Sequence, residues 1–150
     1  MRSNVQDRDK SGRCGDTGNV PDAKRRVARP VVLIVDPDQD ARDLYGNWFT
    51  SIGYDVMSAA AVEWACWATR RHRPDLIVTE LQLHNGTGVE LLHALRRPCE
   101  PPIPTLVITR TGDADLRIAA RDAGAVAVLE KFASWDDLRM WIAALAMPSG

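Results

Sequence analysis

Short apolar segments alternate with amphipathic segments of helical period along the chain from about residue 30 onward. Five apolar segments, each bounded by proline, glycine or a polar residue, predict β-strands: Val31–Val35, Tyr54–Ser58, Leu76–Thr79, Thr105–Ile108 and Val126–Leu129. The first, third and fourth are almost wholly apolar, as in central strands covered on both faces, whereas polar residues mark the second as an edge strand. This alternation predicts βαβ units, and therefore one parallel sheet with five helices.

The first and last predicted helices carry apolar residues at helical spacing. The first, from about Asp38 to Ile52, ends at Gly53. Its apolar stripe, which we expect to be buried, consists of Leu44, Trp48 and Ile52. The last helix, from about Trp135 to Ala146, follows Ser134, whose hydroxyl can cap it. Its expected buried stripe consists of Leu138, Ile142 and Leu145.

Composition limits the class of protein. The 150 residues, 45% hydrophobic and 26% charged with a net charge of −1, fit one soluble globular domain. No apolar run approaches the roughly 20 residues that span a bilayer. The first 30 residues lack the apolar core of a secretory signal, so we expect a cytoplasmic protein. Cys14, Cys66 and Cys99 are odd in number and widely spaced, which favours ordinary thiols over a disulfide framework or a zinc site.

The N-terminal segment differs from the rest in charge. Residues 1–30 hold eight basic and four acidic groups, a local charge of +4, and the remaining residues carry −5. Because this segment is polar and has no apolar period, we expect a disordered basic arm at 1–29, a single folded domain at 30–146 and a tail at 147–150. Lys24–Arg29 could contact nucleic acid or an acidic partner, although a solvated tail is the simpler interpretation.

Polar side chains close four of the five predicted strands. Asp36 follows the first strand, Glu80 the third and Thr109 the fourth, while Glu130 and Lys131 follow the fifth. Because ligands of open α/β sheets bind beyond the carboxyl ends of the strands, we expect these groups to converge on one edge. Lys131 is the one lysine after residue 30, and it supplies a compact point charge where a guanidinium would be forked.

Five segments within about residues 30–146 resemble the receiver domain of bacterial two-component response regulators: VVLIVDPD at 31–38, GYDV at 53–56, RPDLIVTEL at 73–81, IPTLVIT at 103–109 and AGAVAVLEK at 123–131. The resemblance implies a flavodoxin-like, doubly wound five-stranded sheet of order 2-1-3-4-5. In that family, two adjacent acids after strand one and an aspartate after strand three hold magnesium. The aspartate accepts a phosphoryl group from a histidine kinase, and a threonine or serine and a lysine contact that group. Asp36, Thr109 and Lys131 match three of these positions.

Four positions depart from the family's pattern. Pro37 replaces the second acid, Glu80 the phosphoacceptor aspartate, Val128 the aromatic switch residue and Phe132 the proline after the lysine. Pro37 offers no side-chain oxygen to magnesium, so we expect weak or absent metal binding, no cofactor, and slow or absent phosphoryl transfer. Asp38 begins a helix and is expected to point away from the metal position.

The extra methylene of Glu80 moves its carboxylate outward by more than about 1 Å. We therefore expect Glu80 to reach Lys131 or Thr109 directly. It would imitate a phosphoryl group in part, with one negative charge and two oxygens. In the family, an aromatic ring at the position of Val128 moves together with the threonine. Valine has no such ring, so we prefer a receiver held in one state. The structural alternative is that Asp36, Glu80 and Lys131 form an ion-pair network whose only role is stability.

Two tryptophans indicate a candidate interaction surface. On the predicted helix at about 60–71, Ala65, Cys66 and Thr69 occupy positions that face the sheet in the family, which places Trp64 and Trp67 on the far side. Exposed tryptophan is enriched at interface centres, so this face is a candidate for docking or dimerisation. Alternatively, the rings lie over Arg71 or are covered by the N-terminal arm.

Three functional hypotheses follow from the sequence. The preferred one is a stand-alone, atypical receiver of a phosphorelay, acting as a phosphorylation-independent binding module and not as an enzyme. Its partner would be a histidine kinase or another response regulator. A homodimer is also compatible with this hypothesis. The second is a working phosphoacceptor, and the third a nucleic-acid adaptor that uses the basic arm. His72, His84 and His93 lack metal-ligand spacing, and no phosphate-binding glycine loop is present.

Overall fold

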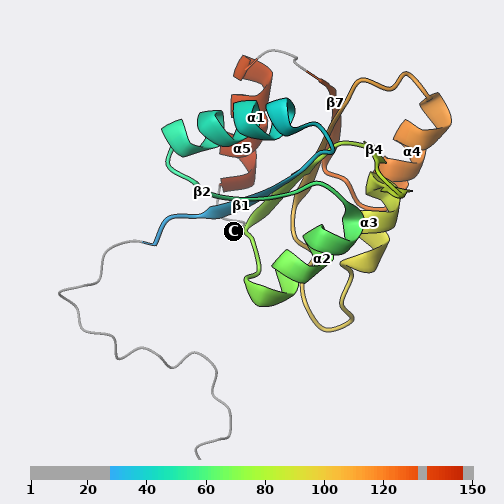
Figure 1. Ribbon diagram of the computed structural model, residues 1–150, viewed down its shortest axis with the longest axis horizontal. Coiled ribbons are helices and arrows are strands. Elements are labelled where there is room, and N and C mark those ends of the chain that lie inside the picture. The colour runs from blue at the N-terminus through green and yellow to red at the C-terminus, as the bar shows by residue number, and fades with distance from the viewer. Residues whose placement is uncertain (1–27, 132–134, 147–150) are drawn as a thin grey trace, which may run out of the picture.

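The computed structural model describes residues 28–131 and 135–146. Within them, five parallel strands form one sheet in the order β2-β1-β3-β6-β7 (Figure 1). Their bounds are β1 Val31–Val35, β2 Asp55–Ala59, β3 Leu76–Thr79, β6 Thr105–Thr109 and β7 Ala127–Glu130. Counted among these five, the order is 2-1-3-4-5, so the predicted topology and the edge position of the second strand are confirmed. Three strands differ from their predicted bounds by one residue at one or both ends.

Five helices cover the two faces of the sheet. Their bounds are α1 Gln39–Ser51, α2 Val62–Arg71, α3 Gly88–Ala94, α4 Ala114–Asp122 and α5 Trp135–Ala146. Helices α1 and α5 lie on one face, and α2, α3 and α4 lie on the other (Figure 1). Alternate residues of β1 serve the two layers: Val32 and Ile34 pack under α1 and α5, whereas Leu33 and Val35 pack against α2 and α3.

The buried stripe predicted for the first helix is wrong by one position. Helix α1 buries Ala41, Tyr45 and Phe49, while Leu44 and Ile52 are exposed. Trp48, from the predicted stripe, is half-buried, and its ring stacks on Trp135 with 5.1 Å between the centroids. The stripe of α5 is confirmed: Leu138 and Ile142 are buried and Leu145 is half-buried.

A small hairpin joins β3 to α3. Strand β4 (Gln82–Leu83) pairs antiparallel with β5 (Gly86–Thr87). Asn85, in the connection, has a φ of 60°. Asparagine tolerates this left-handed conformation better than most residues, so the Asn85–Gly86 pair allows the chain to reverse here.

Several predictions concern residues at the margins of the described part of the chain. Most of the basic arm (residues 1–27), Cys14, Phe132, Ser134 and the tail at 147–150 lie outside the described residues. Arg29, counted with the arm, pairs with Asp55 of β2 at 3.1 Å.

Cys66 and Cys99 are free thiols. Burial raises the pKa of the Cys66 thiol, with Arg70 lowering it and Glu63 raising it, which disfavours a reactive thiolate. None of the described helices has the length and apolarity that a membrane span requires.

Candidate functional site

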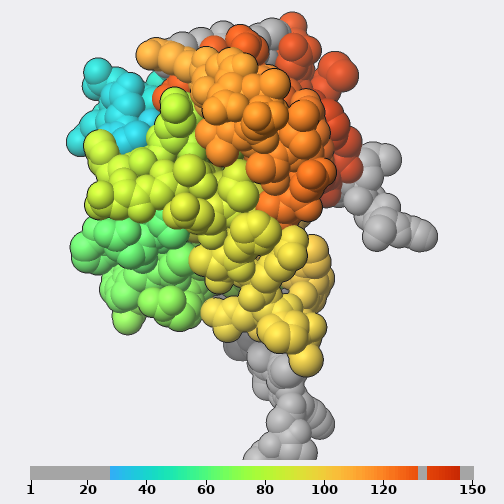
Figure 2. Space-filling view, turned by 90° about the vertical axis from the view of Figure 1, so that its right-hand side faces the viewer, coloured from blue at the N-terminus to red at the C-terminus, as the bar shows by residue number. Residues whose placement is uncertain are grey.

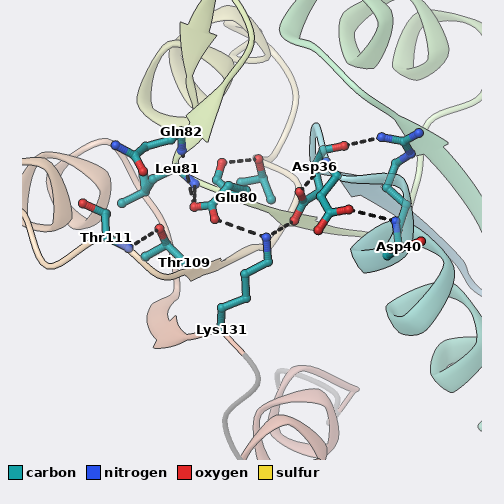
Figure 3. Close-up of polar contacts among 11 residues, drawn as sticks. Asp36, Asp40, Glu80, Leu81, Gln82, Thr109, Thr111 and Lys131 are labelled. Atoms are coloured by element: carbon teal, nitrogen blue, oxygen red, sulfur yellow. Dashed lines mark hydrogen bonds and ion pairs between the residues drawn. The ribbon is translucent and has the colours of Figure 1, made fainter.

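Four predicted residues meet at the carboxyl edge of the sheet (Figure 3). Asp36 follows β1, Glu80 follows β3, Thr109 ends β6 and Lys131 follows β7. Since β1, β3, β6 and β7 are successive neighbours in the sheet, their ends lie side by side. The convergence expected from the sequence is therefore present, and it is built from main-chain topology alone.

An ammonium group joins the two carboxylates of this edge. Lys131 Nζ lies 2.8 Å from Asp36 Oδ2 and 3.4 Å from Glu80 Oε2 (Figure 3). The three side chains expose only 6%, 6% and 8% of their surface for Lys131, Asp36 and Glu80, respectively. Charges removed from water to this degree are costly to desolvate, so each depends on its partners for compensation. Glu80 therefore reaches Lys131, one of the two partners expected for it.

The second oxygen of Glu80 is held by the main chain that follows it. Glu80 Oε1 accepts hydrogen bonds from the amides of Leu81 at 2.6 Å and Gln82 at 3.3 Å. The main chain is also closely packed here: a Cβ on Gly88 would lie 2.9 Å from the Glu80 carbonyl oxygen. Glycine at the start of α3 thus allows that helix to approach the Glu80 segment. Both carboxylate oxygens of Glu80 are consequently engaged by the protein.

Asp36 is fixed at three of its oxygens. Oδ1 accepts from the Asp38 amide at 2.9 Å, Oδ2 pairs with Lys131, and the main-chain oxygen accepts from Arg42 Nη1 at 2.6 Å. The Asp38 carboxylate accepts from the Asp40 amide at 3.0 Å and so caps α1. Asp38 therefore acts as the N-cap of α1.

Thr109 is buried, and its hydroxyl is bonded to a neighbouring main-chain amide. Its Oγ1 accepts a hydrogen bond from the Thr111 amide at 3.1 Å, and no hydrogen bond between Thr109 and Glu80 occurs among the described residues. Of the two partners expected for Glu80, Lys131 is the one observed; the carboxylate is held on one side by two amides and on the other by Lys131. Val128 is buried with Leu81 and Val107 under α4.

Magnesium is the ion that this edge holds in the resembled family, and the residues here do not fit it. Pro37 supplies no side-chain oxygen, Asp38 caps a helix, and Asp36 is already paired with an ammonium. Across residues 28–131 and 135–146, no three His, Cys, Asp or Glu side chains are grouped so that they could hold a metal ion. Lys131 provides the positive charge that a cation would otherwise bring.

Trp64 and Trp67 lie on the outer face of α2, as predicted. They expose 58% and 49% of their surface, and their rings meet edge to face with 6.2 Å between centroids. On the inner face, Ala65 and Thr69 are buried. The guanidinium of Arg71 lies 5.0 Å from the Trp67 ring centroid, so the alternative in which Arg71 covers a ring applies to Trp67.

Arg42 connects the two regions and was not identified from the sequence. It donates to the Asp36 carbonyl and also lines a hollow of about 280 Å³ beside Trp64 and Trp67. The hollow is completed by Ser58, Ala59, Ala60 and Ala68. The only sequence signal was a basic residue early in the first helix, which is common on solvated helices and therefore carries little information.

Comparison with known proteins gives a consistent result. The family model of the response regulator receiver domain matches residues 32–143. The probable transcriptional regulatory protein TcrX of Mycobacterium tuberculosis is 29% identical over 128 residues, which cover 85% of this chain and 54% of TcrX. The response regulator protein PilR of Pseudomonas aeruginosa is 32% identical over 117 residues, covering 78% and 26%. This chain thus spans about half or less of these curated relatives.

A solved structure agrees with the sequence comparison. The crystal structure of a putative response regulator from Chloroflexus aurantiacus superposes with a TM-score of 0.72 and 26% identity. The match covers 79% of this chain and 98% of that one. The residues matched by the family model, 32–143, include Asp36, Glu80 and Lys131.

Proposed function

Since the chain belongs to the response regulator receiver domain family of two-component signalling, we propose that it is an atypical receiver that signals by protein contact without accepting a phosphoryl group. The folded unit that carries this role is residues 30–146. The observation that carries the proposal is the position of Lys131 Nζ between Asp36 Oδ2 and Glu80 Oε2. In this arrangement, the acceptor position holds a glutamate whose carboxylate is already paired with an ammonium and hydrogen-bonded by two amides.

The chemistry of phosphoryl transfer explains why this arrangement opposes the reaction. Catalysis of the transfer depends on positioning and on positive charge that stabilises the moving phosphoryl group. Here the ammonium of Lys131 is already paired with two buried carboxylates, and the residues around it do not fit magnesium. An incoming phosphoryl group would have to displace the Lys131 contact of Glu80 without a cation to replace it.

The same geometry supports a receiver held in one state. Glu80 places one negative charge beside Lys131, whereas a phosphorylated side chain carries more charge and three oxygens, so the imitation is partial. Val128 offers no aromatic ring whose movement could report a change at Thr109. A fixed conformation suits a module that is recognised by its surface, and the partner class we propose is a histidine kinase or another response regulator.

Direct phosphorylation tests this proposal. We expect the intact mass of the protein to remain unchanged after incubation with acetyl phosphate and magnesium chloride. Glu80→Gln, which removes the acceptor charge, provides the matched control and should behave identically. A product heavier by one phosphoryl group in the wild type and absent in Glu80→Gln would support the rival function, a working phosphoacceptor.

The docking role of α2 can be tested separately. Replacing both Trp64 and Trp67 with alanine should weaken partner binding or dissociate an oligomer, because tryptophan dominates the energy of many interfaces. Met140→Ala, which removes an exposed apolar side chain from α5, is the control. Equal oligomer mass and equal partner binding in all three proteins would rule out the Trp64–Trp67 face as an interface.

The alternative of a nucleic-acid adaptor has less support. One of its basic groups, Arg29, pairs with Asp55 and donates to the Tyr54 carbonyl, so its charge is engaged by the sheet edge. Residues 24–27 lie outside the described residues. Salt-dependent binding of nucleic acid that is lost on removing residues 1–29 would favour this alternative.

A further inference from the structure

A second hollow of the molecule lies at the end of the sheet opposite Asp36 and Glu80. It has a volume of about 300 Å³ and is bordered by α3, the end of α4 and the segment that joins α3 to β6. Figure 2 faces this side of the molecule, with the yellow residues that follow α3 below the orange helix α4. The cavity reaches Thr105, the first residue of β6, which places it at the amino ends of the strands.

The walls of this cavity are mostly apolar. Six of the lining residues are Ile77, Leu91, Leu92, Leu95, Pro102 and Ile103. Ile77 and Leu91 are buried in the core cluster between β3 and α3, and Leu95 and Ile103 pack against that cluster. The floor is therefore part of the hydrophobic core, and a molecule that entered would exchange water for apolar contacts. Its volume lies at the lower end of the range for small-molecule pockets.

The rim of the cavity is positively charged. Arg96 and Arg97 line it, and neither forms an ion pair with a carboxylate within residues 28–131 and 135–146. Glu100, the acidic residue of the rim, is engaged by Arg73 at 3.0 Å. Arg96 Nη2 donates to the Ala123 carbonyl at 2.8 Å, which fixes its guanidinium across the end of α4. A guanidinium has five N–H groups, so donors remain for another acceptor.

We propose that this cavity binds a small molecule with an apolar body and one anionic group. The body would occupy the space lined by Leu91, Leu95 and Ile103, and the anion would meet Arg96 and Arg97. A cationic ligand would face two guanidiniums, and an uncharged one would leave their charge uncompensated. The inference does not depend on the proposed function, because the cavity lies at the amino ends of the strands and Lys131 lies at their carboxyl ends.

Titration with octanoate tests the inference. We expect saturable chemical-shift changes in the ¹⁵N amide spectrum, centred on Leu95, Ile103 and Gly124. Octanol and octylammonium, which share the apolar chain, should bind more weakly. Arg97→Gln should raise the dissociation constant of octanoate by about threefold to fivefold, the upper part of the range for an exposed charge pair. Arg121→Gln, which removes the same charge from α4, should leave it unchanged.

The outcomes separate the parts of the proposal. Absence of saturable shifts, or shifts centred elsewhere, would overturn the site itself. Equal binding of octanoate, octanol and octylammonium would overturn the anionic class of ligand, as would an equal effect of Arg97→Gln and Arg121→Gln. Both substitutions are at exposed positions, so the folded state of each variant is expected to match that of the wild type.

Discussion

Replacing Lys131 with methionine is expected to lower the free energy of unfolding by about 3–5 kcal/mol. The methionine keeps the apolar stem but removes the ammonium, which leaves the carboxylates of Asp36 and Glu80 buried without a compensating charge. Breaking a buried pair costs more than the pair itself contributes, because the remaining charge has lost both its partner and its water. Urea denaturation followed by tryptophan fluorescence measures the change.

An exposed ion pair provides the matched control. Arg29→Met removes the partner of Asp55 on β2, where both side chains are more than half exposed. Exposed pairs contribute about 0–1 kcal/mol, so this variant should remain close to the wild type. If Lys131→Met also costs less than about 1 kcal/mol, within the range of exposed pairs, the charges at the site are better solvated than their burial implies.

A triple variant separates the charge effect from a packing effect. Asp36→Asn, Glu80→Gln and Lys131→Met together remove all three charges at similar volume. Replacing a buried ion network by neutral groups is often neutral or stabilising, so we expect the triple variant to recover much of the lost stability. Failure to recover any would point to the shape of the lysine side chain as the origin of the loss. Recovery without change in partner binding would favour the interpretation in which the network serves stability alone.

The topology and the meeting of the site residues could be predicted from the sequence because both follow from chain direction. Parallel strands with alternating helices place every strand's carboxyl end at one edge, whatever the side chains do. Asp36, Glu80, Thr109 and Lys131 are each the residue that ends or follows a strand, so their convergence needed no knowledge of packing. The side-chain contacts among these four residues could not be predicted in the same way. That Lys131 lies closer to Asp36 than to Glu80 depends on side-chain rotamers.

The orientation of α1 could not be predicted for a different reason. Leu44, Trp48 and Ile52 recur every four residues, and so do the observed buried residues Ala41, Tyr45 and Phe49. Two neighbouring stripes of apolar residues satisfy the same period, and periodicity alone does not choose between them. The choice is made by the connection from β1, where Asp38 caps the helix and Arg42 is bonded to the Asp36 carbonyl. These contacts depend on the main-chain path after β1, which the pattern does not contain.

Restoring two aspartates should convert the site into one that binds magnesium and accepts a phosphoryl group. In the double variant Pro37→Asp, Glu80→Asp, the shorter side chain at 80 withdraws its carboxylate from Lys131 by roughly one C–C bond of about 1.5 Å. The new acid at 37 adds a carboxylate beside Asp36. Three carboxylates then face one ammonium where two do in the wild type, and this larger excess of negative charge favours a divalent cation with oxygen ligands.

We expect magnesium affinity to rise at least about tenfold in the double variant, because affinity follows the number of charged ligands. Calorimetry and tryptophan fluorescence measure the binding, and intact mass after acetyl phosphate treatment measures phosphorylation. The single variants are the controls: Glu80→Asp has an acceptor without the second acid, and Pro37→Asp has the acid without the acceptor. If the double variant shows neither magnesium binding nor a phosphoryl adduct, these two substitutions are not what limits the chemistry of the site. The limit would then lie in the contacts around Thr109 and Val128, which the double variant leaves unchanged.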